Sequence, residues 1–304
     1  MPDEDGHLTI PEGTVYIGTS ALMGLPLTSI TIPGSVKLIS QYAFAYCSTL
    51  EEVVFEEGIE NIGSYAFMYT GIRELKLPQS VDRIGIAAFA QCSNLTAAET
   101  DAAMIETYAF AYCTKLRDLT LLSGVTEIGE AAFLETGITT VTLPESLYIL
   151  GTNVFANADF SVRDGETTEI AIGKNLTMIG YNAFGGLPVT GFTVDPENPV
   201  YSDLDGMITD KAQKVLVQVP AGREGEVMVP DGIYSIGPYA FYNCERITDI
   251  WIPDSVLVIT SLAFNSYSDD DPENAREKIT IHCSKGSAAE NYAIENNWPC
   301  VIDE

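Results

Sequence analysis

The sequence predicts an α/β fold, a solenoid wound as a right-handed superhelix with one short parallel strand and short helical turns in each repeat of about 22 residues. Three recurring features predict it: an alternating apolar stretch that ends in proline, a glycine after a later isoleucine, and an Ala-Phe pair. A unit of this size cannot bury both of its faces by itself. Stacked neighbours therefore have to share one continuous core.

The apolar stretch predicts a half-buried strand, because its large side chains alternate, as in Leu27-Thr-Ser-Ile30-Thr-Ile32. A proline that ends strand pairing follows at Pro11, Pro33, Pro78, Pro144, Pro230 and Pro253. The later glycine is expected to adopt a positive φ. It occurs at Gly18, Gly63, Gly85, Gly129, Gly151, Gly180 and Gly237.

The Ala-Phe pair sets the period, and Leu22 and Phe155 fill its phenylalanine position at either end of the first half of the chain. Each segment is too short for a long helix and suits one or two helical turns, with the Phe side chain in the interior. The pairs place this residue at Phe44, Phe67, Phe89, Phe110, Phe133, Phe184, Phe241 and Phe264.

The pattern is interrupted, yet residues 1–304 are expected to form a single solenoid domain. Residues near Asp159–Thr168 predict a longer loop. Two strand-like runs, Met207–Thr209 and Val215–Val219, flank a polar turn and predict a hairpin inserted at about residues 195–222. An acidic loop, Ser268–Asn274, precedes a cap at about residues 279–304, with a last strand at Ile279–Ile281 and a helix over Ser287–Asn296.

Four of the six cysteines lie three residues after the repeat phenylalanine, at Cys47, Cys92, Cys113 and Cys244. A position that recurs in this way predicts a packing slot for a small buried hydrophobe. A bridge between Cys92 and Cys113 is the alternative, and Cys283 could pair with Cys300 if the tail folds back. The two histidines are too few and too badly spaced for a zinc site.

The net charge of −28 argues against nucleic acid or an anionic membrane surface as a partner, because the field of the protein repels phosphate. The sequence contains no apolar run of the roughly 20 residues that a membrane span requires. It also lacks the motifs of zinc proteases, serine hydrolases and nucleotide-binding enzymes. We therefore expect neither enzymatic activity nor a cofactor. The acidic loops faintly suggest calcium, although turns and solvated loops are the simpler explanation.

The repeat Ile-x-Ile-Pro, Val-x-x-Ile-Gly, Ala-Phe-x-x-Cys-x-x-Leu resembles the BspA-type leucine-rich repeat of bacterial surface proteins. The segments Asp195-Pro-Glu-Asn-Pro and Gly286-Ser-Ala-Ala-Glu-Asn-Tyr292 are also similar to that family, so the resemblance covers about residues 8–302. It implies a leucine-rich-repeat solenoid that is secreted or held at the cell surface, with an export signal that is not in this chain. It also implies adhesion to host or bacterial proteins.

Two columns of side chains are expected to point outward from the strands. The first column is mostly acidic and supplies candidate binding residues Glu52, Glu74, Asp118, Glu169, Glu226 and Asp249. The second is rich in threonine and contains Trp251, which suits an interface or a sugar ring unless the C-terminal segment covers it. Solubility and β-propensity are the alternative explanations of the two columns.

Tyrosines flank the repeat phenylalanine and predict either packing between neighbouring repeats or an aromatic contact patch. They are Tyr42, Tyr65, Tyr108 and Tyr239 on one side, and Tyr46, Tyr69 and Tyr112 on the other.

Taken together, these features predict a monomeric extracellular binding module that recognises a protein or a glycan through its repeat surface. The alternatives are a structural spacer within a larger surface protein and, third, an enzyme with an unrecognised carboxylate site.

Overall fold

The computed structural model describes residues 2–156, 168–264 and 279–303. The chain divides into two compact units, the first made of residues 1–160 with 178–183 and the second of residues 161–177 with 184–304. The acidic loop expected at Ser268–Asn274 lies outside the described residues. So does the loop expected near Asp159–Thr168, except for Thr168 itself.

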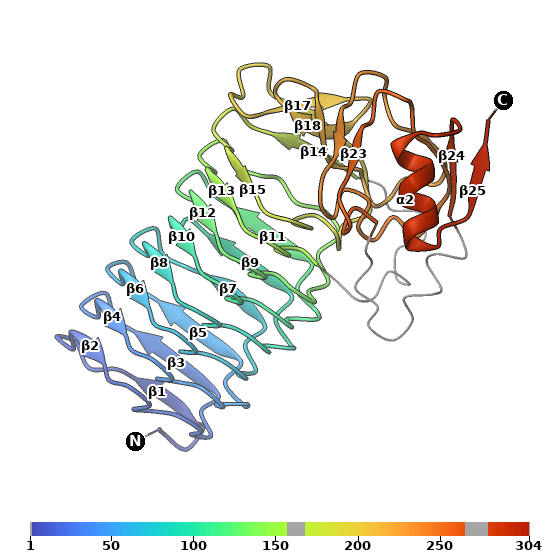
Figure 1. The fold of residues 1–304 in the computed structure, drawn as a ribbon. Coiled ribbons are helices and arrows are strands. Elements are labelled where there is room, and N and C mark those ends of the chain that lie inside the picture. Colours follow the sequence, from blue (N-terminus) through green and yellow to red (C-terminus); the bar gives the residue numbers. More distant parts are fainter. Residues whose placement is uncertain (1, 157–167, 265–278, 304) are drawn as a thin grey trace. The chain divides into compact units, whose positions relative to one another are not determined.

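Unit 1 is a stack of turns in which most repeats contribute two parallel strands, where the sequence predicted one (Figure 1). The longer strands form two three-stranded sheets: β1 (His7–Thr9), β3 (Ser29–Ile32) and β5 (Glu52–Phe55), then β7 (Glu74–Lys76), β9 (Ala97–Thr100) and β11 (Asp118–Leu121). The shorter strands form one eight-stranded sheet of β2 (Tyr16–Ile17), β4 (Leu38–Ile39), β6 (Asn61–Ile62), β8 (Arg83–Ile84), β10 (Met104–Ile105), β12 (Glu127–Ile128), β13 (Ile149–Leu150) and β15 (Met178–Ile179). A two-residue strand has too few residues to show a period, so the sequence pattern did not reveal it.

The Ala-Phe segments are turns, and the helical turns predicted there are not found in the described repeats. Tyr65 and Tyr69 have φ values of +60° and +59°, which no helix contains. Alternate amides, such as Ala66 N–H to Gly63 O at 3.2 Å, close turns within the repeat. The amides between them donate to the next repeat, as Phe67 N–H does to Ala88 O at 2.7 Å. The segment therefore forms a third ladder of hydrogen bonds along the stack.

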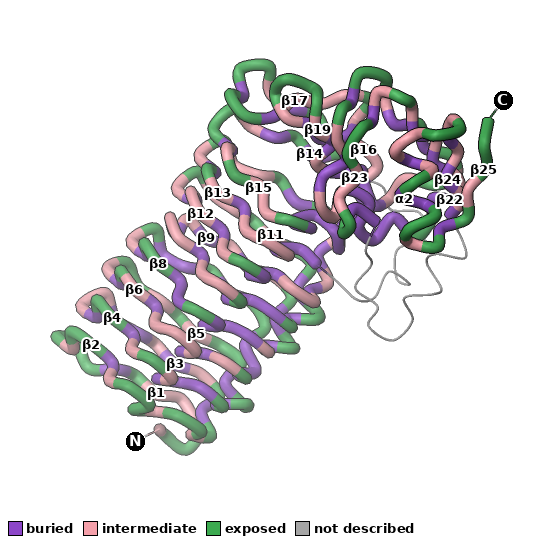
Figure 2. Tube along the Cα trace, in the orientation of Figure 1, coloured by how far each residue is buried: buried purple, intermediate pink, exposed green. Residues whose placement is uncertain are grey.

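The core of unit 1 is a column of phenylalanine rings, as the spacing predicted. Figure 2 shows buried chain lining the inside of the turns. Neighbouring rings lie 4.8 to 5.5 Å apart and within about 11° of parallel. The column contains Phe44, Phe67, Phe89, Phe110, Phe133 and Phe155, all with at most 1% of their surface exposed. Stacking at this spacing adds ring contacts to the burial of apolar area.

The cysteine slot is also confirmed. Cys47, Cys92, Cys113 and Cys244 are buried and free, so no bridge joins Cys92 to Cys113. Their thiols point at backbone carbonyls of an earlier repeat, as Cys47 Sγ does to Leu22 O at 3.1 Å. Burial raises the pKa of Cys244 to about 12, and a buried thiol of that kind is chemically inert.

The prediction that the repeat glycines need a positive φ is wrong. Gly63, Gly85, Gly129 and Gly151 have ordinary backbone angles, and the reason for glycine is space. A Cβ atom on Gly151 would lie 2.7 Å from the amide nitrogen of Glu130 in the preceding repeat. Glycine therefore permits the close approach of stacked backbones.

Unit 2 mixes parallel and antiparallel pairing. β14 (Thr168–Ile172) pairs in parallel with β16 (Val189–Val194), and β17 (Tyr201–Leu204), β18 (Met207–Asp210) and β19 (Val215–Gln218) form an antiparallel meander. β18 and β19 occupy the position expected for the hairpin. β19 also pairs in parallel with β21 (Ser235–Ile236), and β21 pairs in parallel with β23 (Val258–Ile259).

A fully buried asparagine, Asn198, anchors the segment that leads into the meander. Its amide group donates to the carbonyls of Gly173 at 2.8 Å and Leu176 at 2.9 Å. Its side-chain oxygen accepts from the amides of Val200 and Tyr201. The side chain thus satisfies four backbone groups, which explains the asparagine of the Asp195-Pro-Glu-Asn-Pro segment.

The end of unit 2 is a four-stranded parallel sheet of β20 (Gly225–Met228), β22 (Ile247–Trp251), β24 (Thr280–Cys283) and β25 (Cys300–Ile302). The helix predicted over Ser287–Asn296 is α2 (Ala288–Asn296), with Ser287 as its N-cap. The Ser287 hydroxyl accepts from Glu290 N–H at 3.1 Å, which satisfies one of the free amides of the first turn. Tyr292 and Trp298 pack on Phe264, with ring centroids 5.4 Å apart in both pairs.

Candidate functional site

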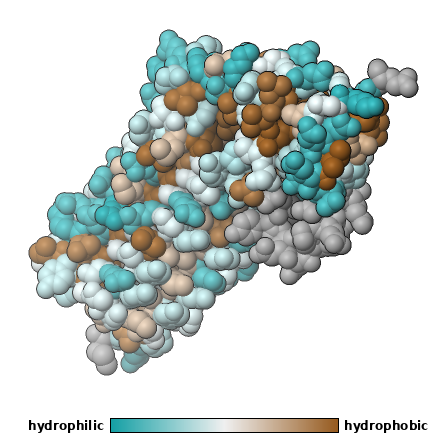
Figure 3. Space-filling view, in the orientation of Figure 1, coloured by the Kyte–Doolittle hydropathy of each residue, from teal (hydrophilic) through white to brown (hydrophobic). Residues whose placement is uncertain are grey.

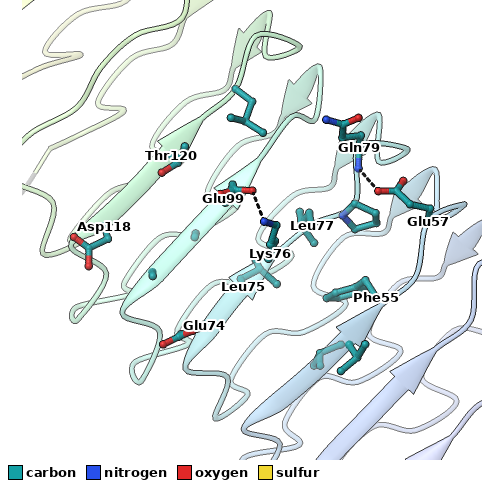
Figure 4. Close-up of a pocket in the computed structure, with 16 residues that line it drawn as sticks. Phe55, Glu57, Glu74, Leu75, Lys76, Leu77, Gln79, Glu99, Asp118 and Thr120 are labelled. Atoms are coloured by element: carbon teal, nitrogen blue, oxygen red, sulfur yellow. Dashed lines mark hydrogen bonds and ion pairs between the residues drawn. The ribbon is translucent and has the colours of Figure 1, made fainter.

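A groove of about 700 Å³ lies over strands β5, β7, β9 and β11 of unit 1 (Figure 4). It spans the place where β5 ends one three-stranded sheet and β7 begins the next. Across the second sheet the pairing register aligns Glu74, Ala97 and Asp118 in one outward row. Alanine is the shortest of the three side chains, so the row is low at its centre.

Carboxylates are the most frequent charged groups in the lining of the groove. Four of the lining residues are acidic, namely Glu57, Glu74, Glu99 and Asp118, whereas Lys76 is its only basic residue. Lys76 Nζ lies 3.2 Å from Glu99 Oε1, as the dashed line in Figure 4 shows. The lysine side chain is 81% exposed, and such an ion pair contributes little to stability.

At the end of the groove formed by the turns after β5 and β7, the Glu57 carboxylate binds backbone amides. Glu57 accepts hydrogen bonds from the amides of Gln79 and Ser80, both at 3.2 Å. These bonds connect the turn after β5 to the turn after β7, and the first is drawn in Figure 4. On β5, Val54 is 45% exposed and offers apolar area in the lining. The groove therefore combines acidic and apolar contacts.

The acidic residues predicted from the sequence are separated into several places. Glu74 and Asp118 line the groove, whereas Glu52 is exposed on β5 beside Ser29 and lies outside the lining. In unit 2, Glu169 is exposed on β14 opposite Gly191. Glu226 and Asp249 are paired neighbours on β20 and β22.

Trp251 is partly covered by a side chain of β24. Its indole stacks on the imidazole of His282, with ring centroids 4.2 Å apart and an interplanar angle of 13°. His282 Nε2 donates to Asp249 Oδ1 at 2.8 Å, and Thr248 Oγ1 donates to Asp249 Oδ2 at 2.8 Å. The hydrogen bonds from His282 and then Thr248 lower the pKa of Asp249. Trp251 and Asp249 thus belong to one cluster, and the cap covers part of the indole.

His282 and Glu57 were missed by the sequence analysis. His282 follows Ile281 in the last predicted strand, and alignment of Ile281 with Ile250 would have placed it beside Trp251. Glu57 lies in a turn between repeats, where no periodic signal marks it. The described residues contain no cluster of three or more His, Cys, Asp or Glu side chains that could hold a metal ion.

The flanking tyrosines pack between repeats and also remain accessible. Tyr42 stacks on Tyr65 with centroids 4.8 Å apart, and Tyr46 on Tyr69 at 5.2 Å. Both Tyr46 and Tyr69 keep 40% or more of their surface exposed. Packing between repeats is therefore confirmed for these residues, and an aromatic contact patch stays a prediction.

Apolar side chains also gather at the first two of the shorter strands, β2 and β4. Val15, Tyr16 and Leu38 are exposed, and Tyr16 lies beside Leu38 in the β2–β4 pairing. Hydrophobic residues are visible near that end of the molecule in Figure 3. The next two strands carry Asn61 and Arg83 at the same position, so the apolar patch is confined to the first two turns.

Among the described residues, none of the helices has the length and apolar character needed to cross a membrane. No curated protein matches the sequence.

Among solved structures, the chain is similar to a leucine-rich cell surface protein from Faecalibacterium prausnitzii A2-165. The two share 24% identity and a TM-score of 0.63 over 91% of this chain and 75% of the other. A leucine-rich repeat protein from Bacteroides ovatus ATCC 8483 matches at 19% identity and a TM-score of 0.47, over 98% and 92% of the two chains.

The sequence also matches the model of the BspA type leucine-rich repeat region at residues 6–96, 97–200 and 225–282. These segments contain the stacked repeats of unit 1 and the sheet of β20, β22 and β24 in unit 2. The match covers most of the chain and agrees with the repeat pattern of the sequence. The chain belongs to the BspA-type leucine-rich-repeat family.

Proposed function

We propose that this protein is an extracellular binding module that holds a basic segment of another protein in the groove over β5–β11. The observation that carries the proposal is the charge of that groove, four carboxylates against one ammonium. Lys76 pairs with Glu99, and Glu57 accepts hydrogen bonds from two backbone amides. The carboxylates of Glu74 and Asp118 therefore remain available to lysine or arginine side chains of a partner. Charge complementarity of this kind steers encounter and selects the partner.

The overall charge supports the same class of partner. At −28 the chain repels polyanions, which disfavours sulfated glycans as well as nucleic acids. The structural neighbour from Faecalibacterium prausnitzii is described as a cell surface protein, which fits an extracellular setting. The exposed Val54 in the lining supplies apolar contact in the groove.

Binding is expected to use many shallow contacts. A stable protein interface covers about 800 Å² on each partner, which is more than one strand row provides. The neighbouring rows on β1 and β3 extend the surface beyond the groove. Because the charged groups are exposed, affinity should fall as salt rises from about 0.05 to 0.5 M.

The test is binding of the full chain to purified fibronectin, laminin and collagen, with heparin as an anionic glycan and chitin fragments as a neutral one. Glu74→Lys with Asp118→Lys should weaken binding to a protein by at least about tenfold through loss of two attractive contacts and gain of two repulsive ones. The matched control is Asp82→Lys with Glu130→Lys, which changes the net charge equally at exposed positions of unit 1 outside the groove.

Equal losses in the two double variants would contradict the groove as the site. Binding only to chitin fragments would replace the protein partner with a glycan. Loss of binding in Trp251→Ala, with the groove variant unaffected, would move the site to the Trp251 cluster of unit 2. Failure to bind any probe would favour the spacer.

A further inference from the structure

Two cysteines meet at the end of unit 2. Cys283 is the last residue of β24 and Cys300 the first residue of β25, and these strands are parallel neighbours. The register pairs Cys300 with Ile281, two residues before Cys283, so both cysteines lie on the same face of the sheet. Their sulfur atoms are 3.3 Å apart. A disulfide bond of about 2.05 Å is within a small side-chain movement of this position.

These cysteines differ from the four in the repeats. Each repeat cysteine is buried among apolar side chains and directs its thiol at a backbone carbonyl, as Cys113 Sγ does to Phe89 O at 3.2 Å. Cys300 is partly exposed, whereas Cys283 beneath it is buried. The pair therefore combines one sulfur that a reagent can reach with a second sulfur placed to complete the exchange.

We propose that Cys283 and Cys300 form a disulfide in an oxidising compartment and that this bond fastens the C-terminal strand. The oxidant is a small-molecule or protein disulfide. The Cys300 sulfur attacks it, releases one thiol and forms a mixed disulfide. The Cys283 sulfur then attacks Cys300 and releases the second thiol. Two protons and two electrons leave the protein, and one external disulfide becomes two thiols.

The bond would hold a strand that has little else to secure it. β25 is three residues long, is the edge of its sheet, and has two exposed residues of three. Asp303 N–H donates to Cys283 O at 3.0 Å, and Asp303 Oδ1 lies 3.7 Å from His282 Nδ1. The disulfide would close a loop around α2, and so tie the cap to β24 and hold Asp303 beside the Trp251 cluster.

The local environment makes the exchange slow at neutral pH. Burial, then contact with Cys283, and then the nearby carboxylates of Glu290 and Asp303 raise the pKa of Cys300 to about 12. The attacking form of a thiol is the thiolate, so oxidation should accelerate as the pH is raised. Cys283 is buried and shielded from direct attack, so a reductant has to reach the bond at Cys300.

The experiment equilibrates the full folded chain with oxidised glutathione at pH 8.5, then denatures it and labels free thiols with a maleimide for mass analysis. Six labels are expected before oxidation and four after it, because two of the six cysteines become joined. Peptide mapping should find one linked pair, which contains Cys283 and Cys300 and separates on reduction. In Cys300→Ser five cysteines remain, and no intramolecular link should form.

Cys283→Ser is the matched variant, and it should instead accumulate a glutathione adduct on Cys300. Six labels in the oxidised wild-type chain would overturn the proposal, as would a mapped bond between Cys92 and Cys113. The mapping uses the wild-type chain, so the result does not depend on whether a variant folds. It is also independent of the groove, which lies in unit 1.

Discussion

The indole of Trp251 lies almost flat against the imidazole of His282, with the two ring centroids 4.2 Å apart. The same imidazole holds the Asp249 carboxylate at 2.8 Å. Trp251 on β22 and His282 on β24 are thus linked to Asp249, a residue that the sequence analysis assigned to the acidic column. The aromatic surface of Trp251 is partly used within the protein, which reduces the area available to a partner.

This cluster predicts a pH dependence. The hydrogen bonds from His282 and then Thr248 lower the pKa of Asp249 from its ordinary value of 3.8. A carboxyl with a lowered folded pKa adds stability above its unfolded pKa, and that stability is lost as the pH falls through the folded value. Asp249→Asn should therefore flatten the fall in unfolding free energy between about pH 5 and pH 2.

Urea unfolding at a series of pH values measures this effect. Glu245→Gln, an exposed change in the same unit, is the control and should keep the acid dependence of the wild type. An Asp249→Asn variant with the wild-type acid dependence would show that the hydrogen bonds leave the carboxyl pKa unchanged.

The phenylalanine column predicts a large cost for truncation. Phe110 is fully buried between Phe89 at 5.2 Å and Phe133 at 5.3 Å. Phe110→Ala should lower the unfolding free energy by about 3–5 kcal/mol, because it removes the ring and leaves a cavity. Tyr148→Ala, at a position 52% exposed in the same unit, should cost less than about 1 kcal/mol. Denaturant unfolding followed by circular dichroism compares the two, and similar losses would contradict the assigned core.

The repeat, the core phenylalanines and the cysteine slot could be predicted because their side chains recur at fixed spacing. Phe110 and Cys113 each occupy one such position. The shorter strands could not be predicted, since two residues carry no alternation. The turn conformation was also hidden, because its positive φ angles occur at residues as different as Tyr108, Ala131 and Asn153.

The groove could be predicted only in part. Glu74 and Asp118 were assigned to an outward column, and the register places them on either side of Ala97. The hollow itself depends on the short side chain at the centre of the row and on the change of sheet between β5 and β7. Those are relationships between repeats, and no single repeat contains them.

The turns predict an unusual response to glycine. Ala131 has a φ of +53°, a conformation that costs an L-residue roughly 1–2 kcal/mol and costs glycine nothing. Ala131→Gly should leave the unfolding free energy unchanged or raise it by up to about 1 kcal/mol, after the entropy of the unfolded chain is included. Ala132→Gly, one residue later and without a positive φ, should lower it by about 1 kcal/mol. If both variants lost the same stability in denaturant unfolding, backbone strain at Ala131 would be excluded.

The stacking glycines predict opposite results at two equivalent positions. A Cβ atom on Gly151 would lie 2.7 Å from the backbone of the preceding repeat, at Glu130 N. On Gly18, in the first turn described, the same atom would meet nothing within 4 Å. Gly151→Ala should therefore cost about 1–3 kcal/mol, because backbones on both sides must move. Gly18→Ala should be neutral or stabilise by up to about 1 kcal/mol, because alanine restricts the unfolded chain.

The two variants test whether glycine is required for space or for backbone angle. Neither Gly18 nor Gly151 has a positive φ, so alanine can adopt the backbone angles of both positions. If backbone angle alone decided the outcome, both substitutions would be tolerated equally. A requirement for space makes only the stacked position sensitive. Thermal and urea unfolding of the two single variants distinguishes these cases. Equal stability of Gly18→Ala and Gly151→Ala would mean that the stack can open between repeats at little cost.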